Sequence, residues 1–409
     1  MNKKVRIFFT EPLFFYIIII NFLKPDSFGN IGLPSFIVRV SLLWDKFIGI
    51  PVILLCLLAL LVTKKNYVND VVFFYGYKIV ATILVTYLTT HAITGGGAFS
   101  HLRRIAAIWY IAVAFQFNYR GTIKRLSYLL TILVILNFIS ILLFPHGMWV
   151  DDNWQNYFLG YDNGHIVVFM PALFFTLWNA YYSKKYTLMI TAWISVYLSA
   201  LICRSGTTMV GLAALLFLLI IIHFPAVRKF LFNWKTVSAV IIGIFIFIIV
   251  LRRQEVFQDL MMKYLGKDGT FTGRVYLWDR AFEIIRKNRW LGVGDASETN
   301  VELFTLNSQK LAYAHNEFLD IMVRSGIIGL FLYLTCIART IKVIKLNKGL
   351  HIKSWLTFMA SFWLMMMFES YSNYSLYYFY FILMIIPRFD ELEKQRNKLF
   401  FFYGQKIIQ

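Results

Sequence analysis

Apolar runs long enough to cross a lipid bilayer recur along this whole chain, and they constrain its fold more than any other feature. A membrane-spanning helix needs about 20 mostly apolar residues. Because such runs recur along the chain, we predict an all-α, polytopic integral membrane protein. Residues 28–42 are expected to form a helix along the membrane surface. The sequence predicts twelve spanning helices, at residues 7–24, 43–63, 71–92, 104–118, 127–147, 164–182, 187–203, 207–223, 235–251, 316–338, 354–371 and 374–388.

The composition excludes an ordinary soluble fold. Only 15% of the 409 residues are charged and 59% are hydrophobic, whereas soluble domains contain about 25% charged residues. The net charge of +20 would suit nucleic-acid binding, but lysines and arginines cluster beside the apolar runs, as they do in membrane proteins. We therefore expect no nucleic-acid partner. The three cysteines are scattered through apolar sequence and indicate neither a disulfide framework nor a metal site.

The basic clusters predict the orientation of the chain, because loops rich in lysine and arginine stay in the cytoplasm. In the twelve-helix arrangement most of these clusters fall on one side, which we assign to the cytoplasm together with both termini. The doublets Arg103/Arg104 and Arg252/Arg253 fall on the other side. That outer side also receives residues 93–103, 148–163, 204–206 and 252–315, and the turn that begins near Glu369.

The long polar segment 252–315, between the ninth and tenth predicted helices, is the main candidate for chemistry. Irregular backbone finds no hydrogen-bond partners in lipid, so a polar segment of this length must lie outside the bilayer. We predict one membrane domain, residues 1–409, in which residues 252–315 form a large extracytoplasmic loop with short amphipathic helices.

Residues 273–288 are predicted to form one such amphipathic helix. Arg274 shares the apolar face of this helix although it lies in the first turn, where a cation opposes the helix dipole. Two explanations are about equally good. An anion binds beside Arg274 and the free N–H groups of the first turn, or Arg274 pairs with a nearby carboxylate or extends to water. The apolar face consists of Val275, Leu277, Trp278, Ala281, Phe282, Ile284 and Ile285.

Two pairs of glycines follow this helix. Gly292 and Gly294 permit a tight turn or a close approach between two backbones, and a simple turn is the favoured interpretation. Gly326 and Gly329 are expected to allow close packing between helices.

His315 lies just before the tenth predicted helix, and Asn316 is at its start. Histidine is the side chain that ordinarily titrates near neutral pH, so His315 could act as a general base toward a hydroxyl group. The alternative is that both residues simply cap the helix that starts at Glu317, and position alone slightly favours this alternative.

Arg204 lies in a short break between two apolar runs. A charge at membrane depth is costly and usually functional, whereas the alternative is a turn arginine that reaches lipid headgroups. Because no acidic residue is close to Arg204 in sequence, we favour a functional role.

Together these motifs resemble, in their order and setting, those of the Wzy-type polysaccharide polymerase and O-antigen ligase superfamily. An R-S-G turn at Arg204 precedes a late apolar run. It is followed by G-R-x-x-x-W at Gly273 to Trp278, by L-G-V-G at Leu291 to Gly294, and by H-N-E-F-L with S-G-I-I-G at His315 to Gly329. Each motif alone is weak, and the ordered set carries the resemblance.

The resemblance implies a glycosyltransferase, independent of metal and of other cofactors, that acts outside the cytoplasmic membrane on a glycan linked to undecaprenyl diphosphate. Arg204 and Arg274 would bind the diphosphate. His315 would accept the proton of the attacking sugar hydroxyl or position that hydroxyl. Trp278 would support the helix or face a sugar. The other supporting residues would be Gly292, Gly294 and Asn316.

One departure from the family pattern leaves the base open. Asp295 follows the L-G-V-G motif, where a small residue is expected, so Glu298 or Glu302 could take the place of His315. Asp162 and Asn163, at the start of the sixth predicted helix, are candidates for sugar contacts or are ordinary loop residues.

The favoured function is a polymerase that joins repeat units into a capsule, exopolysaccharide or O-antigen. Ligases are one specialised member of the superfamily, which contains many polymerases. The alternatives are an O-antigen ligase and a transporter that flips lipid-linked oligosaccharides. Transporters commonly contain internal repeats and polar groups at the midplane, and neither is clear in the sequence. The candidate partners are lipid-linked donor and acceptor glycans, membrane lipid, a chain-length regulator and a flippase.

Overall fold

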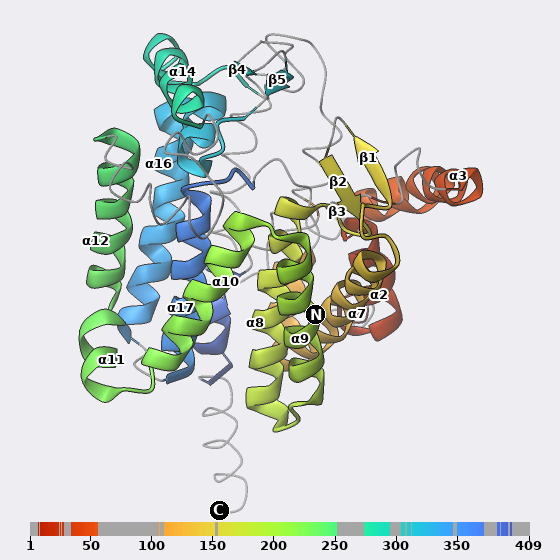
Figure 1. Ribbon diagram of the computed structural model, residues 1–409. Coiled ribbons are helices and arrows are strands. Elements are labelled where there is room, and N and C mark those ends of the chain that lie inside the picture. Colours follow the sequence, from red (N-terminus) through yellow and green to blue (C-terminus); the bar gives the residue numbers. More distant parts are fainter. Residues whose placement is uncertain are drawn as a thin grey trace, which may run out of the picture.

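Long helices that run side by side form the bulk of the molecule (Figure 1). Strands β1 and β2 and helix α14 (Arg274–Lys287) lie toward one end of these helices, and the short helix α11 (Pro225–Leu231) lies toward the other (Figure 1). The computed structural model describes residues 7, 9–23, 25, 27, 34–55, 106, 110–151, 154–251, 274–294, 304–306, 309–311, 313–346, 350–371, 383, 384, 386–391, 393 and 394.

Helix α2 and the central and C-terminal helices contribute to the main apolar core. α7 packs against α8 and α9, and α10 packs against α17. Helix α17 ends at Met366, so Glu369 lies beyond its end. The other helices with described bounds are α2 (Pro12–Phe22), α3 (Ser35–Trp44), α7 (Tyr119–Leu143), α8 (Ile166–Ser183), α9 (Thr187–Cys203), α10 (Gly206–Ile221), α12 (Trp234–Phe245) with the π turn η4 (Ile246–Val250), α16 (Glu317–Leu346) and α17 (Leu350–Met366).

The predicted number of membrane spans is confirmed only in part. Within the described residues, three helices are long and apolar enough to cross a membrane, at Tyr119–Leu143, Asp162–Ser183 and Glu317–Thr335. A fourth span is possible if Pro225–Leu231 and Lys235–Ile249, which meet at a bend of 62°, count as one. The predicted spans 7–24, 187–203 and 207–223 are matched by the shorter apolar helices α2, α9 and α10, and others lie partly or wholly outside the described residues, as 71–92 does. The predicted span 354–371 corresponds to α17 (Leu350–Met366), which is not among these apolar helices.

The boundary that we predicted between a surface helix at 28–42 and a span at 43–63 is wrong where the structure describes it. Helix α3 (Ser35–Trp44) runs directly into a π-helical turn at Asp45–Gly49, and helical structure continues beyond it. The π turn ends at Gly49, and Ile50 separates it from Pro51. The proline ring carries no N–H and clashes with the carbonyl four residues back, which lies within the π turn. A widened turn at this point lets the helix accommodate the proline without ending.

Two small antiparallel sheets add to the all-α architecture that the sequence predicts. Each sheet lies in a segment that was predicted as an outer loop, the first in residues 148–163 and the second in residues 252–315. The strands have only two to four residues, too few for alternation to be recognised in the sequence. The first sheet has the order β1 (Trp149–Asp151), β2 (Trp154–Tyr157), β3 (Gly160–Tyr161), and the second pairs β4 (Phe304–Leu306) with β5 (Gln309–Leu311).

Helix α16 is broken at Gly326, and the segment Arg289–Gly294 lies against the break. Gly326 has φ 62° and ψ −163°, far from helical values. Because the break frees backbone groups of α16, they pair with the glycine-containing segment instead. Four hydrogen bonds join the two: Val293 N to Val323 O (2.8 Å), Gly294 N to Arg324 O (3.0 Å), Ile327 N to Arg289 O (2.8 Å) and Ile328 N to Trp290 O (3.3 Å).

Our expectation of helix–helix packing at Gly326 and Gly329 is therefore wrong. A Cβ on Gly326 would lie 2.2 Å from the carbonyl oxygen of Trp290, which is loop backbone, and a Cβ on Gly329 would meet the side chain of Ser325 in the same helix. At Gly292 a Cβ would lie 2.4 Å from the carbonyl oxygen of Val323. Gly292 and Gly326 therefore allow a close approach between two backbones rather than a simple turn.

Replacing Gly326 with alanine should destabilise the protein by about 2 kcal/mol or more, because a side chain is strained at this φ and would clash with the backbone. Thermal unfolding of the purified protein in detergent measures the effect. The matched control is Gly243→Ala in α12, where a Cβ would meet nothing within 4 Å; alanine is the better helix former, so it should leave the melting temperature unchanged or slightly raised. Equal effects of the two substitutions would contradict this explanation of the break.

Candidate functional site

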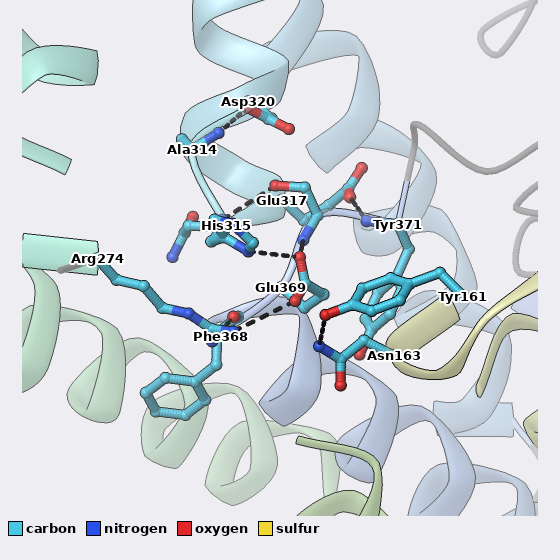
Figure 2. Close-up of polar contacts among 12 residues, drawn as sticks. Tyr161, Asn163, Arg274, Ala314, His315, Glu317, Asp320, Phe368, Glu369 and Tyr371 are labelled. Atoms are coloured by element: carbon cyan, nitrogen blue, oxygen red, sulfur yellow. Dashed lines mark hydrogen bonds and ion pairs between the residues drawn. The ribbon is translucent and has the colours of Figure 1, made fainter. Parts of the chain in front are cut away.

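The buried carboxylate of Glu369 lies between two residues that the sequence singled out. His315 Nδ1 is 2.8 Å from Oε1 of Glu369, and an NH2 group of Arg274 donates to Oε2 at 3.3 Å. Figure 2 shows the two side chains reaching Glu369 from different segments. The side chain of Glu369 is only 1% exposed, whereas those of Arg274 and His315 are each 15% exposed. Arg274 and His315 therefore form the accessible part of the site, and the buried charge of Glu369 lies beneath them.

Helix α14 positions Arg274, and its amphipathic character confirms the sequence prediction. Five of the seven residues on the predicted apolar face are buried, and the other two, Val275 and Phe282, pack against the same apolar cluster. Burying one large apolar side chain contributes about 1.5–3 kcal/mol. This contact holds α14 against α16 and η4, so that the first residue of α14 points toward Glu369.

Arg274 has the carboxylate partner that one of the two sequence explanations required, although the partner is 95 residues away rather than nearby. Its NH1 group also donates to the carbonyl oxygen of Phe368. A guanidinium carries five N–H donors in a planar fork. The two contacts therefore fix the plane of the group and leave other donors for a ligand, so the anion-binding explanation remains open.

The turn before α16 presents His315. The residue has φ 48°, a left-handed conformation that is uncommon for a side chain other than glycine. Asp320 supports the turn, because its Oδ1 accepts a hydrogen bond from the N–H of Ala314 at 2.7 Å. Asn316 caps the helix, with Oδ1 accepting from the N–H of Leu319 at 3.0 Å. The capping alternative is thus correct for Asn316, while the His315 ring points to Glu369.

The start of α16 is also fastened to the segment that follows α17. The N–H of Asn316 donates to the hydroxyl of Ser370 at 3.0 Å, and its side-chain amide donates to the carbonyl of Met367 at 2.9 Å. Oε2 of Glu317 accepts from the N–H of Tyr371 at 2.8 Å. These contacts on both sides of Glu369 hold its carboxylate opposite His315.

The electrostatic surroundings keep Glu369 ionised. Burial alone would raise the pKa of Glu369, but its contact with His315, the positive charge of Arg274 and the hydrogen bond from the Ser370 N–H together hold this pKa below its ordinary value. An ionised carboxylate can only accept hydrogen bonds, so Nδ1 of His315 must carry a proton and donate it to Oε1. In a neutral imidazole, Nε2 is then unprotonated and can act as a base.

Two tyrosines lie beside the pair. The ring of Tyr313 is 4.5 Å from that of His315, measured between centroids. Burial raises the pKa of both Tyr313 and Tyr161, and the negative charge of Glu369 raises both further. Both phenols are therefore neutral at physiological pH and retain a hydroxyl proton.

The turn that contains Arg204 is linked to Tyr161. Arg204 is exposed between α9 and α10 with φ 52°. The hydroxyl of the next residue, Ser205, donates to Oδ1 of Asn163 at 2.5 Å, and the amide of Asn163 donates to the hydroxyl of Tyr161 at 2.8 Å. Tyr161 in turn lies close enough to Arg274 and Glu369 for their charges to affect it. The Arg204 turn, Arg274 and His315 therefore lie at the same end of the helices.

Asp162 and Asn163 lie in the 3-10 turn that starts α8, within this same region. Oδ1 of Asp162 accepts from the N–H of Asn163 at 2.6 Å, and the side chain of Asn163 is held by Ser205 and Tyr161. Both residues are half-buried. Their contacts explain the geometry of the turn, and sugar binding by either of them stays a prediction.

Trp278 has a structural position rather than one facing a ligand. Its side chain is completely buried in the apolar cluster between α14 and α16, so of the two roles expected for it, supporting the helix fits the structure and facing a sugar does not. Gly292 and Gly294, with φ 71° and 78°, fasten the segment after α14 to the break in α16. The alternative bases Glu298 and Glu302 lie outside the described residues.

Glu369 is the residue that sequence reasoning missed, since it was noted only as the start of a short outer turn. Its partners are 54 and 95 residues away, and no local pattern reveals such pairing. One signal was available: a lone carboxylate follows the apolar run FWLMMMF, and a charge in such a position is usually functional. Among the described residues, no group of three histidine, cysteine or acidic side chains is arranged to hold a metal ion.

Comparison with known proteins agrees with the resemblance inferred from the motifs. Residues 187–334 match the family model described as O-Antigen ligase. The Exopolysaccharide production protein ExoQ of Rhizobium meliloti (strain 1021) is 35% identical over 83 residues, which cover 18% of this chain and 19% of that relative. No solved structure matches the chain. The resemblance to the Wzy-type polymerase and O-antigen ligase superfamily is thus confirmed, and the segment 187–334 includes Arg204, Arg274 and His315 but ends before Glu369.

The lowered pKa of Glu369 predicts how stability depends on pH. The ionised carboxylate stabilises the native state fully above its ordinary pKa of 4.5, and this contribution is lost as the pH falls through the lower native pKa. On acidification from about pH 7 to about pH 3, the melting temperature should therefore fall further in the wild type than in Glu369→Gln. Scanning fluorimetry of the purified protein in detergent measures both.

Glu283→Gln is the control for this experiment, because the Glu283 carboxylate pairs with Arg280 on the exposed side of α14. It should keep the pH dependence of the wild type. If Glu369→Gln also kept that dependence, Glu369 would not be held ionised by its partners.

Proposed function

We propose that this chain is a glycosyltransferase that polymerises oligosaccharide repeat units carried on undecaprenyl diphosphate, outside the cytoplasmic membrane. The observation that carries the proposal is the meeting of Arg274 and His315 at Glu369, at the same end of the helices as the Arg204 turn. Transfer from a lipid diphosphate needs a base for the acceptor and positive charge for the leaving group, and these residues supply both.

The proposed step is a single displacement at the anomeric carbon of the donor sugar. The acceptor hydroxyl oxygen attacks this carbon, and its proton passes to Nε2 of His315. The bond between the anomeric carbon and the diphosphate oxygen breaks, and undecaprenyl diphosphate leaves with the electron pair. Arg274 and Arg204 stabilise the charge that builds up on the diphosphate, since guanidinium groups match phosphate oxygens in pairs. No bound metal is required for this step.

Polymerisation is preferred to ligation because the curated relative is described as an exopolysaccharide production protein. The description of the matching family, O-Antigen ligase, supports transfer to a different acceptor as the second candidate. Both reactions use the same donor and leaving group. The proposed location is the cytoplasmic membrane with the site on its outer side, and the proposed substrates are lipid-linked glycans that serve as donor and acceptor.

Arg274→Ala, Arg204→Ala and His315→Ala should each reduce chain growth about 100-fold or more, because each removes either charge stabilisation or the base. The assay incubates the purified protein in proteoliposomes with lipid-linked oligosaccharides extracted from the organism that carries this chain, and reads product length by mass spectrometry. Arg280→Ala, on the exposed side of α14, and His223→Ala, beyond the end of α10, should extend the pool as the wild type does.

Each other outcome in this assay has a definite meaning. Full polymerisation by Arg274→Ala would refute its role in binding diphosphate. Movement of intact oligosaccharide across the vesicle membrane without lengthening would indicate a transporter. Lengthening that requires an added acceptor of another kind would indicate a ligase.

A further inference from the structure

Both oxygens of the Glu369 carboxylate are used at once, one by each candidate catalytic side chain. Oε1 accepts from His315 and Oε2 accepts from Arg274. We infer that Glu369 is a positioning residue, which fixes the proton on Nδ1 of His315 and orients the guanidinium of Arg274 toward the diphosphate. This inference rests on the proposed glycosyl transfer and adds a residue beyond the segment that matches the family model.

The His315 half of the inference follows from hydrogen-bond chemistry. A histidine can abstract a proton only through a ring nitrogen that carries none, and the other nitrogen must then hold the single proton. Glu369 accepts at 2.8 Å from Nδ1 and has no proton of its own to donate. The unprotonated nitrogen is therefore Nε2. When the ring accepts a second proton during transfer, the carboxylate also stabilises the positive charge.

The Arg274 half follows from the arrangement of its contacts. NH1 donates to the Phe368 carbonyl and NH2 donates to Glu369, so two neighbouring acceptors on one segment hold the guanidinium. Within the part of the chain that the structure describes these are its two acceptors, so three of the five N–H bonds stay open to phosphate oxygens. Because the group is already oriented, less conformational entropy is lost when the diphosphate binds.

The simpler explanation is that Glu369 only stabilises the fold around it. The neighbouring residues argue against this, because the segment after α17 is already fastened to α16 through Ser370, Met367 and Tyr371. A buried carboxylate is a costly way to add one more contact. The two side chains that it contacts are partly accessible, at 15% each, whereas Glu369 is 1% exposed, so the charge is placed where a ligand can reach its partners.

An amide cannot replace this carboxylate, and this gives the inference its test. Glutamine keeps the size of Glu369 but offers one oxygen and one NH2 group. The oxygen should keep the charge-assisted bond to Arg274, which is the stronger of the two. The NH2 group then faces His315 and can donate only if Nδ1 loses its proton. The ring proton moves to Nε2, and the base is lost.

In the proteoliposome assay, Glu369→Gln should therefore lower kcat about 100-fold to about 10⁴-fold while KM for the lipid-linked oligosaccharide changes only a few-fold. Glu369→Asp keeps two acceptors and should recover at least about tenfold of the lost kcat. Glu283→Gln is the matched control for charge removal at an exposed site and should keep wild-type kcat and KM.

The outcomes separate this inference from the proposed function. If the wild-type protein did not lengthen the lipid-linked oligosaccharide, both the proposed function and this inference would be overturned. Lengthening by the wild type together with unchanged kcat in Glu369→Gln would overturn the inference alone. A fall in the amount of folded Glu369→Gln protein with unchanged kcat per folded molecule would identify a purely structural role and overturn the inference. A kcat that does not recover in Glu369→Asp would also overturn it.

A spectroscopic measurement covers the case in which the variants do not fold. In wild-type protein labelled with ¹⁵N-histidine, the signals of His315 among the seven histidines are identified by their loss in His315→Gln. Once the ring carries a single proton, we expect that proton on Nδ1 and an unprotonated Nε2. A proton on Nε2, or an equal mixture of the two forms, would overturn the inference.

Discussion

One buried negative charge determines how the site is built. A carboxylate that is 1% exposed is costly unless it is paired and hydrogen-bonded. Glu369 obtains its partners from α14, from the turn before α16 and from its own segment after α17. Because these partners are far apart in sequence, the charge is satisfied only when all three segments are in place. The same interaction therefore stabilises the tertiary structure and prepares two side chains for chemistry.

Backbone contacts make this arrangement rigid. The break in α16 at Gly326 accepts the segment that follows α14, so α14 and α16 are joined by hydrogen bonds as well as by their apolar cluster. The cap by Asn316 fixes the start of α16, and its amide also holds the segment that carries Glu369. Catalytic geometry requires such support, since a side chain displaced by about 1 Å loses much of its effect.

The sequence predicted the features that depend on local patterns. Helical periodicity located α14 and its apolar face, and the capping role of Asn316 was among the alternatives considered. The features that were missed depend on contacts between distant segments. These include the pairing of Glu369 and the approach of Trp290 to Gly326. The short strands were missed because two to four residues carry too little periodicity.

The most direct test is an experimental density map of the protein in lipid nanodiscs with an undecaprenyl-diphosphate-linked oligosaccharide bound. We expect Glu369 within hydrogen-bonding distance of both Nδ1 of His315 and the guanidinium of Arg274. We expect the diphosphate against Arg204 and the remaining N–H groups of Arg274. A map in which Glu369 contacts neither residue, or in which the diphosphate lies at the opposite end of the helices, would contradict the central claim.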